Sequence, residues 1–171
     1  MNYIYASYSP VGVLTVASDG DNITGLWIAG QKYFAATLDE PAVAKELPVF
    51  ERVQKWLSIY FDGKNPTFTL PLAPKGSAFR KAVWDILCSV PYGKIITYRD
   101  IAKMVAAQMG RTTMSAQAVG GAVGHNPISL LIPCHRVVGT DGSLTGYAAG
   151  MRIKMKLLTM EGADLSKLYI P

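Results

Sequence analysis

"TYRDIAKMVAAQMGRTTMSAQAVGGAVGHNP", residues 97–127, decides the fold of the second half of this chain. It contains two short helical patterns joined by a tight, glycine-bearing turn. Thr97 and Asp100 form a capping-box-like pair at the start of the first helix. The second helix, within residues 112–125, is rich in small residues and ends at Asn126-Pro127. The pair predicts a helix-turn-helix or winged-helix arrangement whose second helix enters a groove of DNA, although ordinary helical packing gives the same pattern.

The segments around this stretch extend the prediction. Residues 77–90 form an amphipathic helix with Ser77 as its N-cap, and residues 92–98 form a short strand or turn. The apolar run at 128–133 predicts a strand that leads to Cys134, and residues 150–162 form a last helix. Near the N-terminus, three β segments precede a helix that spans residues 41–63.

A domain boundary is expected near residue 75, after a proline-rich segment. Residues 1–75 hold six Lys/Arg and seven Asp/Glu, a net charge of −1, whereas residues 76–171 hold eleven and five, a net of +6. We therefore expect an α+β protein with an α/β domain at 1–75 and a helical, winged-helix domain at 76–171. The basic half indicates either a solvated surface or one that binds a polyanion.

Composition excludes several classes of protein. No run of about 18 apolar residues exists, so no membrane span is expected, and the first residues lack the features of a signal peptide. Two cysteines and two histidines, without a CxxC pair, argue against a disulfide scaffold and against a structural zinc site. We expect a cytoplasmic protein without metal or cofactor.

Cys134 and His135 are the candidate reactive pair. A lone cysteine after an apolar run is usually a small buried side chain, as we expect for Cys88. If residues 134 and 135 are extended, their side chains point to opposite faces, so a bridging water or a local bend would have to carry a proton between them. A carboxylate would keep the imidazole basic, and Glu161, at a helix end, is a candidate among five acids. A cysteine hydrolase and a DNA-binding module without chemistry are the alternatives.

Four motifs together resemble the O6-alkylguanine-DNA alkyltransferases. They are "GGAVGHNP", "IPCHRVV", "TGYAAG" and "LLTMEG", and the resemblance covers residues 77–171. It implies a ribonuclease H-like N-terminal domain and irreversible, single-turnover transfer of an alkyl group from O6-alkylguanine in DNA to Cys134. It further implies that the protein is a monomer and that the damaged base is flipped out of double-stranded DNA, approached from the minor groove. Acceptance of O4-alkylthymine and the size of the alkyl group stay open.

The resemblance also implies roles for individual residues. His135 would be a water-mediated base that Glu161 orients, Asn126 would brace the turn, and Tyr98 would contact the phosphate and donate to the leaving guanine. The expected catalytic residues are Cys134, His135, Glu161, Asn126 and Tyr98. The expected substrate-binding residues are Tyr98, Gln117, Val137, Tyr147 and Ala148. The expected DNA-binding residues are Tyr98, Thr112, Thr113, Ser115, Gln117, Ala118, Gly120 and Arg136.

The chain departs from the family pattern at two positions. Gln117 stands where the family has an arginine that fills the gap left by the flipped base, and Lys156 stands where relatives usually have an aromatic residue. Lys154 matches a lysine of the family, and we interpret it as structural. An uncharged Gln117 puts the strength of base extrusion in doubt rather than the chemistry.

Overall fold

The computed structural model describes residues 1–171, which divide into two compact units. The first comprises Met1–Lys75 and Pro127–Ser129, and the second comprises Gly76–Asn126 and Leu130–Pro171. Helices and small sheets are both present, which confirms the α+β class. None of the helices is long and apolar enough to cross a lipid bilayer.

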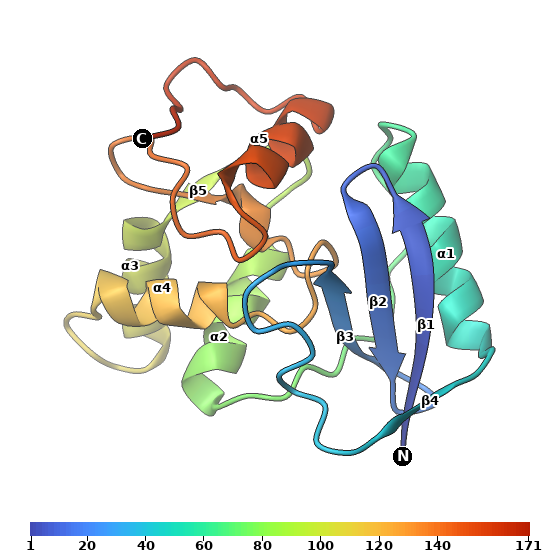
Figure 1. Ribbon diagram of the computed structural model, residues 1–171. Coiled ribbons are helices and arrows are strands. Elements are labelled where there is room, and N and C mark those ends of the chain that lie inside the picture. Colours follow the sequence, from blue (N-terminus) through green and yellow to red (C-terminus); the bar gives the residue numbers. More distant parts are fainter. The chain divides into compact units, whose positions relative to one another are not determined.

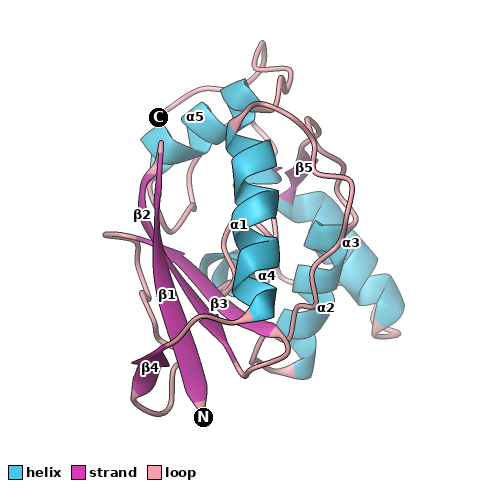
Figure 2. Ribbon diagram, turned by 90° about the vertical axis from the view of Figure 1, so that its right-hand side faces the viewer, coloured by secondary structure: helices cyan, strands magenta, loops and turns pink.

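The first unit is a small sheet with one helix. Strands β1 (Asn2–Ser9), β2 (Gly12–Ser18) and β3 (Ile23–Ile28) pair antiparallel, and β4 (Ala42–Ala44) pairs parallel to β1, in the order β3-β2-β1-β4 (Figure 1). Helix α1 (Pro48–Phe61) runs alongside β1 (Figure 2), where the rings of Tyr5 and Phe50 lie 4.6 Å apart. The helix was expected to begin at residue 41; instead β4 occupies that stretch and a proline opens α1 at its first turn.

Two irregular segments cover the free edge of β3. The N–H of Ile23 donates to the carbonyl of Pro71 (2.7 Å), and the N–H of Ala73 donates to the carbonyl of Ile23 (2.8 Å). Further along the strand, Leu26 exchanges backbone hydrogen bonds of 2.9 Å with Pro127 and Ser129. The proline-rich segment before residue 75 therefore packs against the sheet, and both segments satisfy backbone groups that an open edge would leave unpaired.

Three packed helices form the centre of the second unit: α2 (Ala78–Cys88), α3 (Tyr98–Gln108) and α4 (Ala116–Gly124). Each begins at a hydroxyl N-cap, with the side chains of Ser77, Thr97 and Ser115 accepting a backbone N–H three residues on. The indole of Trp84 in α2 donates to the carbonyl of Ala122 in α4 (2.9 Å). The expected helix pair is thus confirmed, with α3 and α4 as its members.

The expected strand at 128–133 is wrong. This segment is buried but turns repeatedly: Leu130 has a φ of +70°, and the chain enters a short 3-10 helix, η1 (Cys134–Arg136). A two-residue strand β6 (Val137–Val138) follows and pairs parallel with β5 (Ile96–Thr97). Helix α5 (Met151–Met160) then packs against η1. Burial makes the run apolar, and an apolar run alone does not distinguish a buried strand from a buried turn.

Candidate active site

Cys134 begins η1 and is only 3 % exposed. Its N–H donates to the carbonyl of Ile132 (2.8 Å), and the N–H two residues later donates to the carbonyl of Pro133 (3.1 Å). The chain is therefore not extended at the cysteine. It makes the local bend that was one of the two possibilities given by the sequence. In a 3-10 turn, neighbouring side chains are about 120° apart, whereas along a strand they point to opposite faces.

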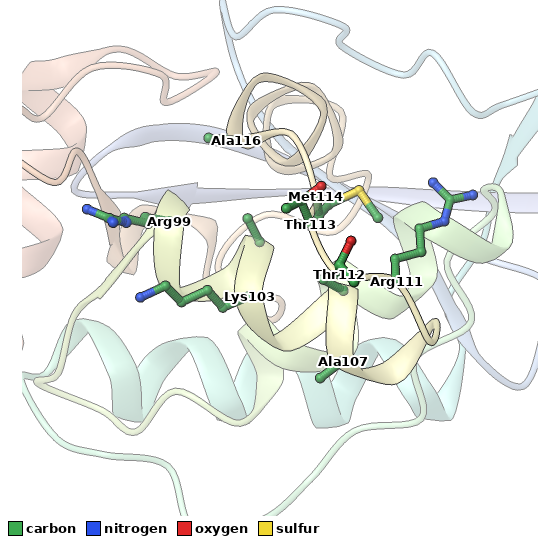
Figure 3. A pocket seen from close by; sticks show the side chains of 10 residues that line it. Arg99, Lys103, Ala107, Arg111, Thr112, Thr113, Met114 and Ala116 are labelled. Carbon is green, nitrogen blue, oxygen red and sulfur yellow. The ribbon is translucent and has the colours of Figure 1, made fainter.

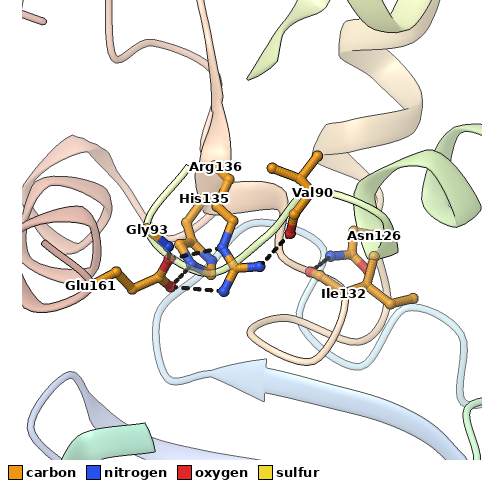
Figure 4. A network of polar contacts seen from close by, with 7 residues as sticks. All are labelled: Val90, Gly93, Asn126, Ile132, His135, Arg136 and Glu161. Carbon is orange, nitrogen blue, oxygen red and sulfur yellow. Dashed lines mark hydrogen bonds and ion pairs between the residues drawn. The ribbon is translucent and has the colours of Figure 1, made fainter. Parts of the chain in front are cut away.

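Asn126 joins the end of α4 to this turn. Its buried side-chain amide donates to the carbonyl of Ile132 (2.8 Å; Figure 4) and also hydrogen-bonds Cys134. One side chain therefore holds both the turn and the sulfur. The hydrogen bond to the sulfur favours the thiolate.

Cys134 is a thiol until something removes its proton. Burial raises the pKa of the Cys134 thiol, and the hydrogen bond from Asn126 and the charge of Lys154 oppose that rise. Because the desolvated thiolate is disfavoured, a base close to the sulfur is needed to make the nucleophile at neutral pH.

His135 and Glu161 form a buried pair beside the cysteine. Nε2 of His135 lies 2.5 Å from Oε2 of Glu161, and both side chains are fully buried. Burial lowers the pKa of His135, against the opposing hydrogen bond and charge of Glu161, so the ring is neutral and able to accept a proton. Burial alone would raise the pKa of Glu161, but its bonds to His135 and Arg136 lower it to about 2. The carboxylate therefore stays ionised and can stabilise a protonated imidazole.

The planar guanidinium of Arg136 donates two hydrogen bonds to the same carboxylate. Its Nε donates to Oε1 of Glu161 (2.8 Å) and its Nη2 to Oε2 (3.2 Å), while Nη1 donates to the carbonyl of Val90 (2.8 Å; Figure 4). The N–H of Gly93 adds a fourth donor to Glu161 (3.1 Å). Arg136 is 8 % exposed and its donors point inward, so we assign it to this cluster and not, as expected from the resemblance, to a DNA surface.

The carbonyl of Thr145 joins Tyr98 and Lys154 at the loop that follows η1. It accepts from the hydroxyl of Tyr98 (3.1 Å) and from the ammonium of Lys154 (3.3 Å). Gly146 has a φ of +93°, and a Cβ there would collide with the Tyr98 hydroxyl. Burial, followed by the charge of Cys134, raises the pKa of Tyr98 to about 12. The phenol therefore stays protonated and can donate.

Tyr147 lies above the histidine. The two rings are 6.4 Å apart and nearly perpendicular, and the hydroxyl of Tyr147 is buried without a hydrogen-bond partner. Burial raises the pKa of Tyr147 well above its usual value. Ala148, next in the loop, is half-buried, and Val137, just after η1, is buried. Val137 thus lies directly after η1, and Tyr147 and Ala148 lie in the loop before α5.

Six of the eight expected DNA-binding residues lie on α4 and on the segment before it (Figure 3), whereas Tyr98 begins α3 and Arg136 ends η1. Gln117 and Ala118 are exposed in the first turn of α4, and Gly120 is half-buried in its middle. A Cβ on Gly120 would meet no atom within 4 Å outside its chain neighbours and the backbone of its own helix. The remaining three, Thr112, Thr113 and Ser115, are all exposed.

Sequence reasoning gave two charged residues of the site other roles, because Lys154 was interpreted as structural and Arg136 was placed on the DNA surface. Lys154 is fully buried, and desolvation lowers its pKa to about 8. It stands three and four residues before the buried Leu157 and Leu158, so a lysine on the apolar face of a helix was the available signal. The sequence carries no such signal for Arg136. Its two hydrogen bonds to Glu161 depend on how the end of α5 packs against η1.

Two protein-family models match the chain. The "6-O-methylguanine DNA methyltransferase, DNA binding domain" matches residues 78–163, and the "6-O-methylguanine DNA methyltransferase, ribonuclease-like domain" matches residues 1–74. Together they cover both units.

Curated proteins and solved structures give the same result. A methylated-DNA–protein-cysteine methyltransferase of Haemophilus influenzae is 40 % identical over 94 % of this chain and 88 % of its own length. One of Methanosarcina barkeri is 40 % identical over 92 % of this chain and 95 % of its own. The crystal structure of Mycobacterium tuberculosis OGT in complex with DNA matches with a TM-score of 0.81 and 34 % identity, over 97 % of this chain and 94 % of that one.

Proposed function

Because the chain belongs to the 6-O-methylguanine DNA methyltransferase family, we propose that it repairs DNA by taking the alkyl group from O6 of guanine onto Cys134. The observation that carries this proposal is a buried thiol hydrogen-bonded to Asn126, next in sequence to the buried His135–Glu161 pair. An sp3 carbon on an aromatic ether is a soft electrophile, which suits attack by sulfur.

The residues divide the reaction into proton transfers and one displacement. His135 takes the thiol proton, the sulfur of Cys134 forms a bond to the alkyl carbon, and the carbon–O6 bond breaks. The electron pair of that bond goes to guanine, which receives a proton from the hydroxyl of Tyr98, and the proton held by His135 restores the phenol. In total, one proton passes from the Cys134 thiol to the guanine. The thioether product has no hydrolysable bond, so the protein is consumed once per lesion.

The damaged base has to leave the duplex to reach a sulfur that is 3 % exposed. We propose that α4 lies in the minor groove and that Gln117 fills the gap left by the base. The glycine at position 120 supports this placement. Glycine inside a helix costs about 1 kcal/mol relative to alanine, and the space beyond Gly120 is open within the protein. Packing inside the protein does not require a glycine at position 120. Close approach of DNA to α4 would explain why the residue there is glycine.

The remaining predictions from the sequence belong to the same proposal. The protein acts as a monomer, without a cofactor, in the cytoplasm. A reducing compartment suits this chemistry, because only a reduced Cys134 can accept an alkyl group, and both cysteines of the chain are unpaired.

Intact-mass analysis with an O6-methylguanine duplex tests the proposal. We expect one added methyl group per protein, unchanged in Cys88→Ala and absent in Cys134→Ala, so that the exposed cysteine serves as the matched control. Repeated turnover would indicate a cysteine hydrolase. An unmodified protein after excess damaged duplex would indicate a DNA-binding module without chemistry.

A further inference from the structure

We propose that residues 165–169 form a strap that fixes the loop 139–150, and that Tyr169 is a positioning residue for the damaged base. The strap follows α5 and returns to the loop that joins β6 to α5, where Tyr169 and Ser143 form an isolated parallel bridge (Figure 1). The loop carries Tyr147, whose ring lies beside the histidine of the buried pair. The inference rests on the proposed function, because the base that the loop would hold is the substrate of that reaction.

Backbone hydrogen bonds join the strap to the loop on both sides of Ser143. The N–H of Tyr169 donates to the carbonyl of Gly142 (3.0 Å), and the N–H of Leu144 donates to the carbonyl of Tyr169 (3.0 Å). Gly142 has a φ of +90°, and a Cβ there would collide with the carbonyl oxygen of Lys167. Both the positive φ and the close approach require glycine. The strap therefore lies directly against the backbone of the loop.

The side chain of Tyr169 adds a charge-assisted hydrogen bond. Its hydroxyl donates to Oδ2 of Asp141 (2.8 Å), while Oδ1 of Asp141 accepts from the N–H of Ser143 (3.0 Å). The bond from Ser143 and then the bond from Tyr169 lower the pKa of Asp141. The carboxylate is therefore ionised at neutral pH, and its two oxygens join the strap to the loop.

Apolar packing also holds the strap against the loop. Leu144 of the loop is fully buried, and Leu165 and Leu168 of the strap pack against the cluster to which it belongs. The other buried members of this cluster are Val138, Leu158 and Ala163. Because the two leucines of the strap shield the cluster from water, detaching the strap would expose the side of the loop that carries Leu144.

The part of the loop that faces the site begins where the contacts of the strap end. Thr145 follows Leu144 directly, and its carbonyl accepts from the hydroxyl of Tyr98 (3.1 Å) and from the ammonium of Lys154 (3.3 Å). Tyr147 follows two residues later. A loop released at Leu144 would move the carbonyl and the ring of Tyr147 together, whereas η1 and α5 hold the nucleophile and its proton acceptor. We therefore expect the strap to affect the binding of the base more than the rate of the chemical step.

Labelling by free O6-benzylguanine tests the positioning role. We would measure the half-saturating concentration and the maximal rate for the wild type, Tyr169→Phe and Tyr169→Ala. Tyr169→Phe keeps the ring and removes the bond to Asp141, so it should raise the half-saturating concentration about threefold to fivefold, with a maximal rate within about twofold of the wild type. Tyr169→Ala should raise it further. An unchanged half-saturating concentration in both variants, or a loss confined to the maximal rate, would overturn the inference.

Two control variants separate positioning from a general loss of stability. Ile170→Ala shortens an exposed side chain next to the strap and should change neither parameter. Ser77→Ala removes the N-cap of α2, so it should lower the melting temperature and leave the half-saturating concentration unchanged. An equal rise of that concentration in Ser77→Ala and Tyr169→Phe would show that the role of Tyr169 is merely structural.

Hydrogen exchange tests the strap without relying on the reaction. In Tyr169→Ala the amides of Leu144 and Thr145 should exchange at least several-fold faster than in the wild type, while the amides of α2 keep their rates. Unchanged exchange at Leu144 and Thr145 would overturn the strap. A wild type that O6-benzylguanine does not label would count against the proposed function, and the exchange rates would then decide alone whether the strap holds the loop.

Discussion

At the scale of single residues, the charges of Arg136 and Glu161 determine the net charge of the buried group around Cys134. Before reaction the buried group holds a neutral thiol, a neutral imidazole, a carboxylate and a guanidinium. In the proposed reaction His135 accepts the proton of Cys134, and the group then holds one more cation and one more anion, so that its net charge is unchanged. An internal proton transfer that creates no net charge avoids most of the desolvation cost of ionising a buried thiol.

Replacing Arg136 should therefore change the pH profile. The guanidinium lowers the pKa of His135, so in Arg136→Met the ring should be protonated, and unable to act as a base, up to a higher pH. We expect the acid limb of O6-benzylguanine labelling to move to higher pH, with a neutral-pH rate lower by roughly tenfold to a hundredfold. Arg136→Lys keeps the charge and should restore much of the acid limb. Identical acid limbs in Arg136→Met and the wild type would contradict this role.

Glu161 should also link stability to pH. Its pKa is lowered from 4.5 to about 2 in the folded protein, so its contribution is fully present above pH 4.5 and is lost as pH falls toward 2. At neutral pH the contribution is on the order of 3 kcal/mol. Urea unfolding below pH 4.5 should show a steeper loss of stability for the wild type than for Glu161→Gln. If the stabilities of the wild type and Glu161→Gln changed in parallel with pH, Glu161 would not be the group that links stability to pH.

Lys154 should trade stability for reactivity. Its pKa of about 8 shows that the folded state disfavours its charge, while that same charge favours the thiolate of Cys134. Lys154→Met, of similar length, should raise the free energy of unfolding by on the order of 2 kcal/mol. It should also slow labelling by O6-benzylguanine. A variant that labels as fast as the wild type would show that the ammonium does not assist the sulfur.

At the scale of elements, the helices were predictable because their ends carry local signals. Ser77 and Thr97 are N-caps in the structure as in the sequence. The elements that were missed or misplaced lack such signals. Strand β4 has only three residues, and the apolar stretch before Cys134 turns at Leu130, whose positive φ is not encoded by a glycine. Long-range hydrogen bonds decide both cases, and local pattern does not report them.

The composition of α4 leads to a prediction about the whole helix. Gly120→Ala should raise the melting temperature, because alanine favours the helix by about 1 kcal/mol and the added methyl meets no protein atom. It should nevertheless weaken duplex binding while leaving free O6-benzylguanine labelling unchanged. Gly124→Ala, at the end of the same helix and also open to space, is the control that should stabilise without weakening binding. Equal duplex affinities for the wild type and Gly120→Ala would remove Gly120 from the DNA surface.

At the scale of the whole molecule, the N-terminal unit includes three residues from the second half of the chain. Pro127 and Ser129 bond to Leu26 of β3, and Ile128 between them is fully buried. Charge balance and proline content indicate a boundary near residue 75, but they give no sign of this return. It depends on a backbone pairing between residues about a hundred positions apart. Sequence therefore predicts the two units better than it predicts the path of the chain between them.

This path predicts a weakened fragment. In residues 76–171 expressed alone, Pro127 and Ser129 lose their partners and Ile128 is exposed to water, only a few residues from Asn126 and Cys134. We expect O6-benzylguanine to label the fragment at least several-fold more slowly than the full chain, and residues 1–75 added in trans to restore part of the rate. A fragment as reactive as the full chain would show that the turn holds its shape unaided.

The return of Pro127–Ser129 to the sheet also bears on how such a protein can diverge or be recombined. The N-terminal half of one homologue cannot simply replace that of another, because each half has to pair with residues 127–129 of the second half. A chimera joined at residue 75 inherits a mismatched tripeptide within ten residues of the nucleophile. Co-transplanting positions 127–129 with the donor half is the minimal graft that preserves the pairing.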